Sequence, residues 1–203
     1  YNIFYIKPYK FADMKILVVT AIKEEYLLSR NNVFHLVTGV GIPNSIYSLT
    51  KHMSDNSYDL VINVGICGSF TPKYTIGSVV EVINDSFSEI GYVDEHGFSQ
   101  FTNDFDIKTS FNSHQKTDLE CADAITVNTV NNRNNSNSLG FLSVDVESME
   151  GASIMMVCEK FNMPSLQIRG VSNYVEERNK KNWDIPLAIS NSNHHLDLFL
   201  SNL

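Results

Sequence analysis

Residues 15–20, KILVVT, form a continuous apolar run that is rich in valine and isoleucine. A strand with one solvated face would alternate apolar and polar residues, so this run is typical of a strand that is buried on both faces. Residues 60–64 form a second run of this kind, and it leads directly into the glycine-containing segment 65–69. Buried strands of this type, each followed by a turn, favour an α/β fold.

The rest of the sequence continues this pattern. Further strands are expected at residues 33–38, 78–84, 124–130, 144–146 and 165–170. Helices are expected at residues 21–28, from Pro43 to about Met53, at 149–161 and at 185–200. The alternation predicts a single-domain, three-layer α/β sandwich, with a central twisted sheet that is mixed but largely parallel. Residues 90–116 give few periodic cues, and residues 131–137 are expected to form an asparagine-rich loop.

Met14 directly precedes the first expected strand, which makes it a candidate start of the protein. On this interpretation, residues 1–13 are an N-terminal extension that is not native, and residues 14–203 form the domain. The extension lacks the apolar stretch and the cleavage site of a signal peptide, and no apolar run reaches the ~20 residues that span a bilayer. We therefore expect a cytoplasmic protein without a membrane partner.

The composition argues against several classes of partner and cofactor. The 203 residues carry a net charge of −8, which does not favour nucleic acid or an anionic membrane as the main partner. The cysteines at 67, 121 and 158 form no paired motif, so we expect them to be small buried hydrophobes in a reducing compartment. The six histidines show no metal-ligand spacing, and we expect no metal ion and no other cofactor.

Polar or glycine-rich segments fall at the ends of four expected strands, where ligands bind in an open α/β sheet. They are Glu25, the glycine segment 65–69, residues 147–152 (ESMEGA) and residues 169–173 (RGVSN). Each has an ordinary structural explanation when taken alone, because glycines often form turns and carboxylates often stabilise helix starts. Taken together, they indicate a small-molecule site.

The order of these segments resembles the nucleoside phosphorylase/nucleosidase superfamily, from about Met14 to Ser190. Within it, the chain is most similar to the futalosine hydrolases and more distantly similar to the methylthioadenosine/S-adenosylhomocysteine nucleosidases. The matching stretches are 126–130 (TVNTV), 169–175 (RGVSNYV) and parts of 178–188. Two regions depart from the pattern: the segment between residues 28 and 33 is short, and residues 90–116 fit poorly. The resemblance implies an N-ribosyl hydrolase that releases hypoxanthine from futalosine, in the futalosine route of menaquinone biosynthesis.

The resemblance also implies the residues of the site. Glu25 would be the general base that activates water, with Arg169 orienting or charge-balancing its carboxylate and Ser172 helping to position it. Glu150 would accept hydrogen bonds from the ribose hydroxyls, and Met149 would pack on the face of the sugar. The substrate-binding set is completed around the base by Ile66, Gly68 and Val130.

Asn173 carries an argument about the base that does not depend on the resemblance. A 6-oxopurine offers hydrogen-bond acceptors at both N7 and O6, and an amide NH₂ can donate to them without presenting a negative charge. The adenine-specific nucleosidases have an aspartic acid at this position. Asn173 therefore favours hypoxanthine or guanine over adenine as the base.

Other functions stay open at this stage. Phosphorylases of the superfamily hold phosphate with arginines, and neither glycine segment, 39–41 or 65–68, contains one, which favours water as the attacking group. The alternatives are a purine nucleoside phosphorylase acting on 6-oxopurine nucleosides, a methylthioadenosine/S-adenosylhomocysteine nucleosidase, and a module that only binds a nucleoside. The resemblance further implies a homodimer, in which a neighbouring chain could close the pocket.

Overall fold

Strand β1 (Ile16–Thr20) lies inside the main sheet, paired in parallel with β2 (Val33–Val37) on one side and with β3 (Leu60–Ser69) on the other. The computed structural model describes residues 14–101, 107–130, 144–176 and 179–203. All five residues of β1 are buried, with Ile16 and Val18 in one core cluster and Leu17 and Val19 in another. The two clusters lie on opposite faces of the sheet, because successive side chains of a strand point to opposite sides. This explains why the run has no polar alternation.

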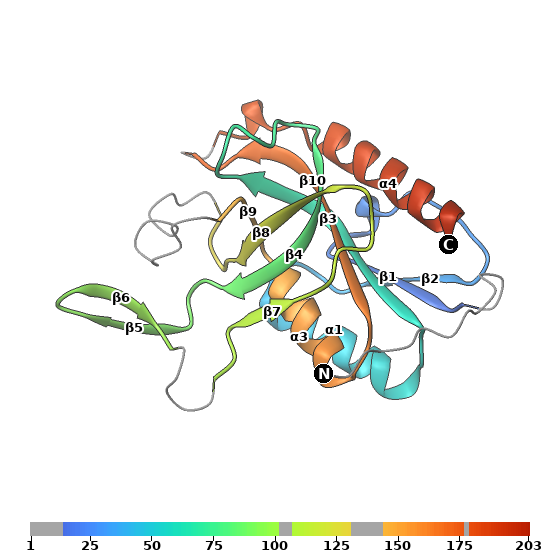
Figure 1. Cartoon of the computed structure of the whole chain (residues 1–203), viewed down its shortest axis with the longest axis horizontal. Coiled ribbons are helices and arrows are strands. Elements are labelled where there is room, and N and C mark those ends of the chain that lie inside the picture. Colours follow the sequence, from blue (N-terminus) through green and yellow to red (C-terminus); the bar gives the residue numbers. More distant parts are fainter. Residues whose placement is uncertain (1–13, 102–106, 131–143, 177–178) are drawn as a thin grey trace.

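Helices cover both faces of this sheet (Figure 1). Helix α4 (Ile185–Asn202) packs on one face through Leu196 and Leu200. Helices α1 (Ile42–Asp55) and α3 (Gly151–Lys160) pack on the other, through a cluster that includes Leu49 and Ile154. The expected three-layer α/β architecture is confirmed.

The sheet is mixed, with parallel pairs in the majority. Among the described residues, its eight strands follow the order β10-β4-β8-β9-β3-β1-β2, with β7 paired to β4 and an additional pairing of β10 with β3. The elements not yet introduced are β4 (Val79–Phe87), β7 (Ser110–Asn112), β8 (Glu120–Thr126), β9 (Val146–Ser148) and β10 (Ser165–Tyr174). The antiparallel pairs are β10–β4, β3–β9 and β4–β7. Because β10 pairs with both β3 and β4, strands β3, β10, β4, β8 and β9 form a closed circuit.

Several expected boundaries are wrong, and the differences are informative. Strands β3 and β10 run to Ser69 and Tyr174, so the glycine segment and the RGVSN segment lie inside strands and not beyond them. Strand β8 ends at Thr126, before most of the expected strand 124–130. In place of the helix expected at 21–28 there is one short 3₁₀ turn, η2 (Lys23–Glu25), after which the Leu27 N–H donates to the Asn193 side chain of α4.

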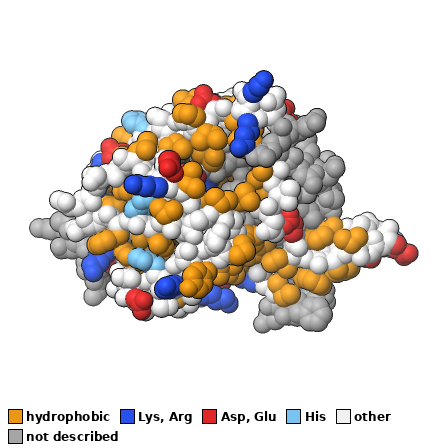
Figure 2. All heavy atoms as spheres, turned by 180° about the vertical axis from the view of Figure 1, so that it is seen from behind, with side chains coloured by type: hydrophobic (Ala, Val, Ile, Leu, Met, Phe, Trp, Pro, Cys, Tyr) orange, Lys and Arg blue, Asp and Glu red, His pale blue; other side chains and the backbone are white. Residues whose placement is uncertain are grey.

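The segment 90–116 forms a projecting hairpin of β5 (Gly91–Asp94) and β6 (Gly97–Gln100), followed by β7, and its residues 102–106 are not described. Hydrophobic side chains lie along this hairpin (Figure 2). The proposed extension 1–13, the asparagine-rich loop 131–137 and Arg178 all lie outside the described residues. Within the described part, no helix is long and apolar enough to span a bilayer.

Candidate active site

A pocket of about 250 Å³ opens where the carboxyl ends of β1, β3 and β10 meet β9 and the start of α3. This volume is near the lower end of the ~300–1,000 Å³ range of small-molecule sites. The lining residues that the sequence had predicted are Glu25, Ile66, Gly68, Val130, Met149, Glu150, Ser172 and Asn173. Eight of the nine predicted site residues therefore share one cavity.

Glu25 ends the η2 turn, and its carboxylate is fixed by backbone N–H groups. Its Oε2 accepts from the N–H groups of Ala21 and Ile22 at 2.9 and 3.2 Å, and its Oε1 accepts from the N–H of Ile66 at 3.2 Å. Glu25 is 5% exposed. A carboxylate has about four lone-pair positions, so these three bonds set its orientation and leave capacity for one more donor.

Arg169, the ninth predicted residue, lies behind the pocket wall and is buried. Its Nε donates to the Gln167 side chain at 2.9 Å, and its Nη2 donates to Asn63. Gly65 separates its guanidinium from Glu25: a Cβ added at Gly65 would lie 2.5 Å from Arg169 Nη1 and 2.8 Å from Glu25 Oε1. Only glycine therefore lets these two charged groups approach each other across β3.

Glu150 reaches across the pocket to the start of α1. Its Oε1 accepts from the Gly41 N–H at 2.8 Å, at a helix end that favours negative charge. Burial raises the pKa of the Glu150 carboxyl above its ordinary value and Glu25 raises it further, while Arg169 and the Gly41 N–H lower it. The adjacent Met149 is half-buried and also lines the cavity.

Asn173 lies near the end of β10, and its amide has a defined orientation. Its Nδ2 donates to the Tyr174 carbonyl oxygen at 3.0 Å, an atom that can only accept. Its Oδ1 accepts from the Ser172 hydroxyl at 2.8 Å. Asn173 Nδ2 also lies close to Gly68: a Cβ added at Gly68 would be 3.1 Å from it. The acceptors of the Ser172 hydroxyl are this amide and, at 3.2 Å, the Cys67 carbonyl oxygen, and not the Glu25 carboxylate that the sequence analysis assigned to it.

The structure adds pocket residues that the sequence analysis did not assign. They are Ala21, Ile22, Val40, Cys67, Glu147, Ser148, Lys180, Trp183 and Ile185. The sequence could have marked two of them as site residues. Glu147 lies in the same segment as Glu150, and Trp183 is the only tryptophan of the chain. Lys180 is the only cation among the described residues that line the cavity.

The cavity is lined by the carboxylates of Glu25, Glu147 and Glu150 and by the amide of Asn173, which can form hydrogen bonds with a sugar and a base. Within the described residues, no cluster of His, Cys, Asp or Glu side chains is arranged to hold a metal ion. The three cysteines are free thiols, and burial raises the pKa of Cys67 and of Cys158 to about 12. These two buried thiols are therefore neutral at physiological pH and are poor candidates for a nucleophile.

In the comparison with protein families, residues 19–200 match the phosphorylase superfamily. The comparison with curated proteins gives no match.

One similar solved structure is a mutant 5′-methylthioadenosine nucleosidase of Helicobacter pylori with 5′-methylthioadenosine in its active site. It superposes with a TM-score of 0.79 at 16% identity, and the match covers 94% of this chain and 99% of the other. The futalosine hydrolase of Helicobacter pylori gives 0.78 at 15% identity, with coverage of 96% and 100%. The S-adenosylhomocysteine nucleosidase of Streptococcus pyogenes gives 0.78 at 18% identity, with coverage of 94% and 97%. At such low identities these likenesses show a shared fold.

Proposed function

The chain belongs to the phosphorylase superfamily, and on that basis we propose that it hydrolyses the N-ribosyl bond of futalosine, releasing hypoxanthine and dehypoxanthine futalosine in the futalosine route of menaquinone biosynthesis. Membership of this superfamily supports an enzyme that cleaves glycosyl bonds. The choice of base and of attacking group rests on the pocket.

The orientation of Asn173 is the observation that carries the choice of base. The Tyr174 carbonyl can only accept, so it fixes Nδ2 on its own side and leaves Oδ1 to the Ser172 hydroxyl. The amide consequently presents a donor, and not an acceptor, toward a bound purine. A 6-oxopurine matches this donor through N7 and O6, whereas the 6-amino group of adenine would face it with a second donor.

The charges around the pocket support water, and not phosphate, as the attacking group. Glu150 already occupies the N–H of Gly41 at the start of α1, where a phosphate would otherwise find a helix N-terminus. Glu25 and Glu147 add further negative charge to the lining, with Lys180 as the opposing cation among its described residues. A phosphate dianion is disfavoured beside three carboxylates.

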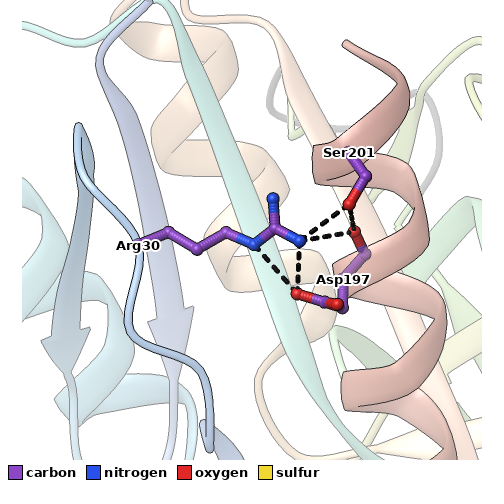
Figure 3. A network of polar contacts seen from close by, with 3 residues as sticks. All are labelled: Arg30, Asp197 and Ser201. Atoms are coloured by element: carbon purple, nitrogen blue, oxygen red, sulfur yellow. Dashed lines mark hydrogen bonds and ion pairs between the residues drawn. The ribbon is translucent and has the colours of Figure 1, made fainter.

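Arg30 is also unavailable for phosphate binding. Its Nε donates to Asp197 Oδ1 at 2.8 Å, and its Nη2 donates to Asp197 and to the Ser201 hydroxyl, both on α4 (Figure 3). This network ties the segment before β2 to the C-terminal helix. Arg133 lies outside the described residues.

In the proposed reaction, Glu25 accepts a proton from a water molecule as that water attacks C1′ of the ribose. The C1′–N9 bond breaks through an oxocarbenium-like state, and its electron pair leaves with the purine as an anion. The purine anion takes up one proton from solvent to give hypoxanthine, and Glu25 returns its proton to solvent. Asn173 Nδ2 donates a hydrogen bond to the departing base, Glu150 accepts from the ribose hydroxyls, and Arg169 balances the charge of Glu25. Met149 packs on the sugar, and Ile66, Gly68 and Val130 line the base.

We further propose a cytoplasmic homodimer. Ile22 and Val40 line the pocket, yet they stay 41% and 49% exposed, so a second copy of the chain could cover this apolar rim. The free cysteines accord with a reducing compartment.

The choice of substrate is tested by the rate of base release from futalosine, inosine, methylthioadenosine and S-adenosylhomocysteine. We expect futalosine to be cleaved with the highest kcat/KM and to release hypoxanthine. A preference for methylthioadenosine would assign the chain to the adenine-releasing nucleosidases instead.

A further inference from the structure

A carboxylate outside the pocket lies between two parts of the proposed active site. Asp85 of β4 is fully buried, and no step of the proposed reaction uses it. Its Oδ1 accepts from the Thr126 hydroxyl at 2.9 Å, and its Oδ2 accepts from Gln167 Nε2 at 3.1 Å. Burial raises the pKa of Asp85 to about 6, and the Gln167, Thr126 and Arg169 contacts act against that rise. Burying a carboxylate costs folding free energy unless it is hydrogen-bonded, so a buried carboxylate such as Asp85 is expected to have a role.

One branch from Asp85 leads to Arg169. Gln167 donates to Asp85 through Nε2 and accepts from Arg169 Nε through Oε1 at 2.9 Å. Because Asp85 can only accept when it is ionised, it fixes which end of the Gln167 amide faces Arg169. The other end of the guanidinium lies beside Glu25, across Gly65.

The other branch leads to the segment that carries Glu150. The Thr126 hydroxyl gives its single proton to Asp85 and accepts from the Ala152 N–H at 2.7 Å, at the start of α3. The intervening Gly151 packs directly over Asp85 and Gln167, with no space for a Cβ. The two branches therefore connect Arg169 and the Glu150 segment through one buried acceptor.

We propose that Asp85 is a positioning residue: through Gln167 it holds Arg169 against Glu25, and through Thr126 it holds the start of α3 that carries Glu150. The proposal rests on the proposed function, because it assigns Asp85 to the groups that carry out hydrolysis there. An amide at position 85 could not replace the carboxylate. If its oxygen kept the bond from Thr126, its NH₂ would face Gln167 Nε2, and turning the Gln167 amide would then place an NH₂ against Arg169 Nε.

The experiment compares Asp85→Asn with an exchange variant that combines Asp85→Asn and Gln167→Glu. In the single variant we expect kcat to fall about 10- to 100-fold, the scale for misplaced catalytic groups, with KM and hypoxanthine affinity within about twofold of wild type. In the exchange variant, the new amide at position 85 donates to the new carboxylate at position 167, which again presents an acceptor to Arg169 Nε. We expect kcat to return to within about threefold of wild type.

Asp123→Asn is the matched control, since Asp123 lies on the adjacent strand β8 and its carboxylate is held by Asn84 and not by the Gln167 branch. We expect it to retain wild-type kcat. An unchanged kcat in Asp85→Asn, or a folded exchange variant as slow as the single variant, would overturn the proposal. If the single variant does not fold, the exchange variant decides by itself, because a folded and active protein supports the proposal and a folded and inactive one refutes it.

A readout that needs no turnover separates this proposal from the proposed function. The Arg169 Nε–H should give a slowly exchanging NMR signal in wild type and in the exchange variant, and this signal should shift or vanish in Asp85→Asn. A signal that ignores the single substitution overturns the positioning role even if no nucleoside is cleaved. Cleavage of inosine or methylthioadenosine in place of futalosine would refute only the proposed substrate, and the kcat comparison would then use the nucleoside that is cleaved.

Discussion

Replacing Asn173 by aspartate exchanges the nitrogen that we propose faces the base for an oxygen, and it should shift the substrate preference from a 6-oxo toward a 6-amino purine. Asn173 is 3% exposed, and its Nδ2 donates to the Tyr174 carbonyl at 3.0 Å. In Asn173→Asp this donor becomes an oxygen. If ionised, it repels the Tyr174 carbonyl as well as N7 and O6 of a 6-oxopurine. If protonated, it has a single hydrogen for three acceptors.

The magnitude follows from one buried hydrogen-bond mismatch, which costs about 1–3 kcal/mol. The ratio of kcat/KM for a 6-oxopurine nucleoside to that for its 6-amino analogue should therefore fall by about 5- to 150-fold. The assay measures base release from a matched pair of substrates that differ only at the 6-position.

Asn193→Asp is the control for this prediction. Asn193 is also 3% exposed, but its amide bonds Leu27, Glu25 and Ile189 backbone groups and does not line the pocket. This change should lower stability and leave the substrate ratio unchanged. If the ratio also stays constant in Asn173→Asp, then Asn173 does not read the base, and the argument for a 6-oxopurine is refuted.

Substitutions of Glu25, Gly65 and Asp85 test three other parts of the site and its supporting network. Glu25→Gln should lower kcat by about 10²–10⁴-fold while hypoxanthine still binds, as single-turnover and binding measurements would show; a loss below about tenfold would mean that another group is the base. Gly65→Ala should lower kcat by about 10²-fold, because its Cβ would lie 2.5 Å from Arg169 Nη1 and must push the guanidinium from Glu25; unchanged kinetics would contradict this geometry. Burial raises the pKa of Asp85 from 3.8 to about 6, and Arg169 is the charged group that opposes the rise. Between about pH 4 and 6 the folded state therefore holds a proton on Asp85 that the unfolded state has lost. Stability should therefore fall as pH rises through that window, by up to about 3 kcal/mol from this group, and urea unfolding of Asp85→Asn at pH 4.5 and pH 7 should lack that contribution.

Eight of the residues that line the pocket could be predicted from the sequence, because they lie in recognisable segments. Glu25 follows and Asn173 ends a strand with a long apolar run, Glu150 follows the short strand β9, and the sheet brings those strand ends together. Asn173 could even be given a preference of base, because its donor and acceptor chemistry is a property of the side chain.

The supporting network could not be predicted in this way. The strand expected at residues 78–84 stops one residue before Asp85, whereas in the structure β4 continues to Phe87 and includes Asp85. Gln167 is a polar residue between two apolar neighbours in β10, a pattern that does not reveal its partners. The roles of Asp85 and Gln167 arise from the pairing of β10 with β4, which is a long-range property of the fold.

The most direct test of the central claim is the identity of the sugar product formed from futalosine, with and without inorganic phosphate. We predict free dehypoxanthine futalosine and one equivalent of hypoxanthine, formed at the same rate in both buffers. A sugar 1-phosphate, or a rate that depends on phosphate, would contradict the account and assign the chain to the phosphorylases.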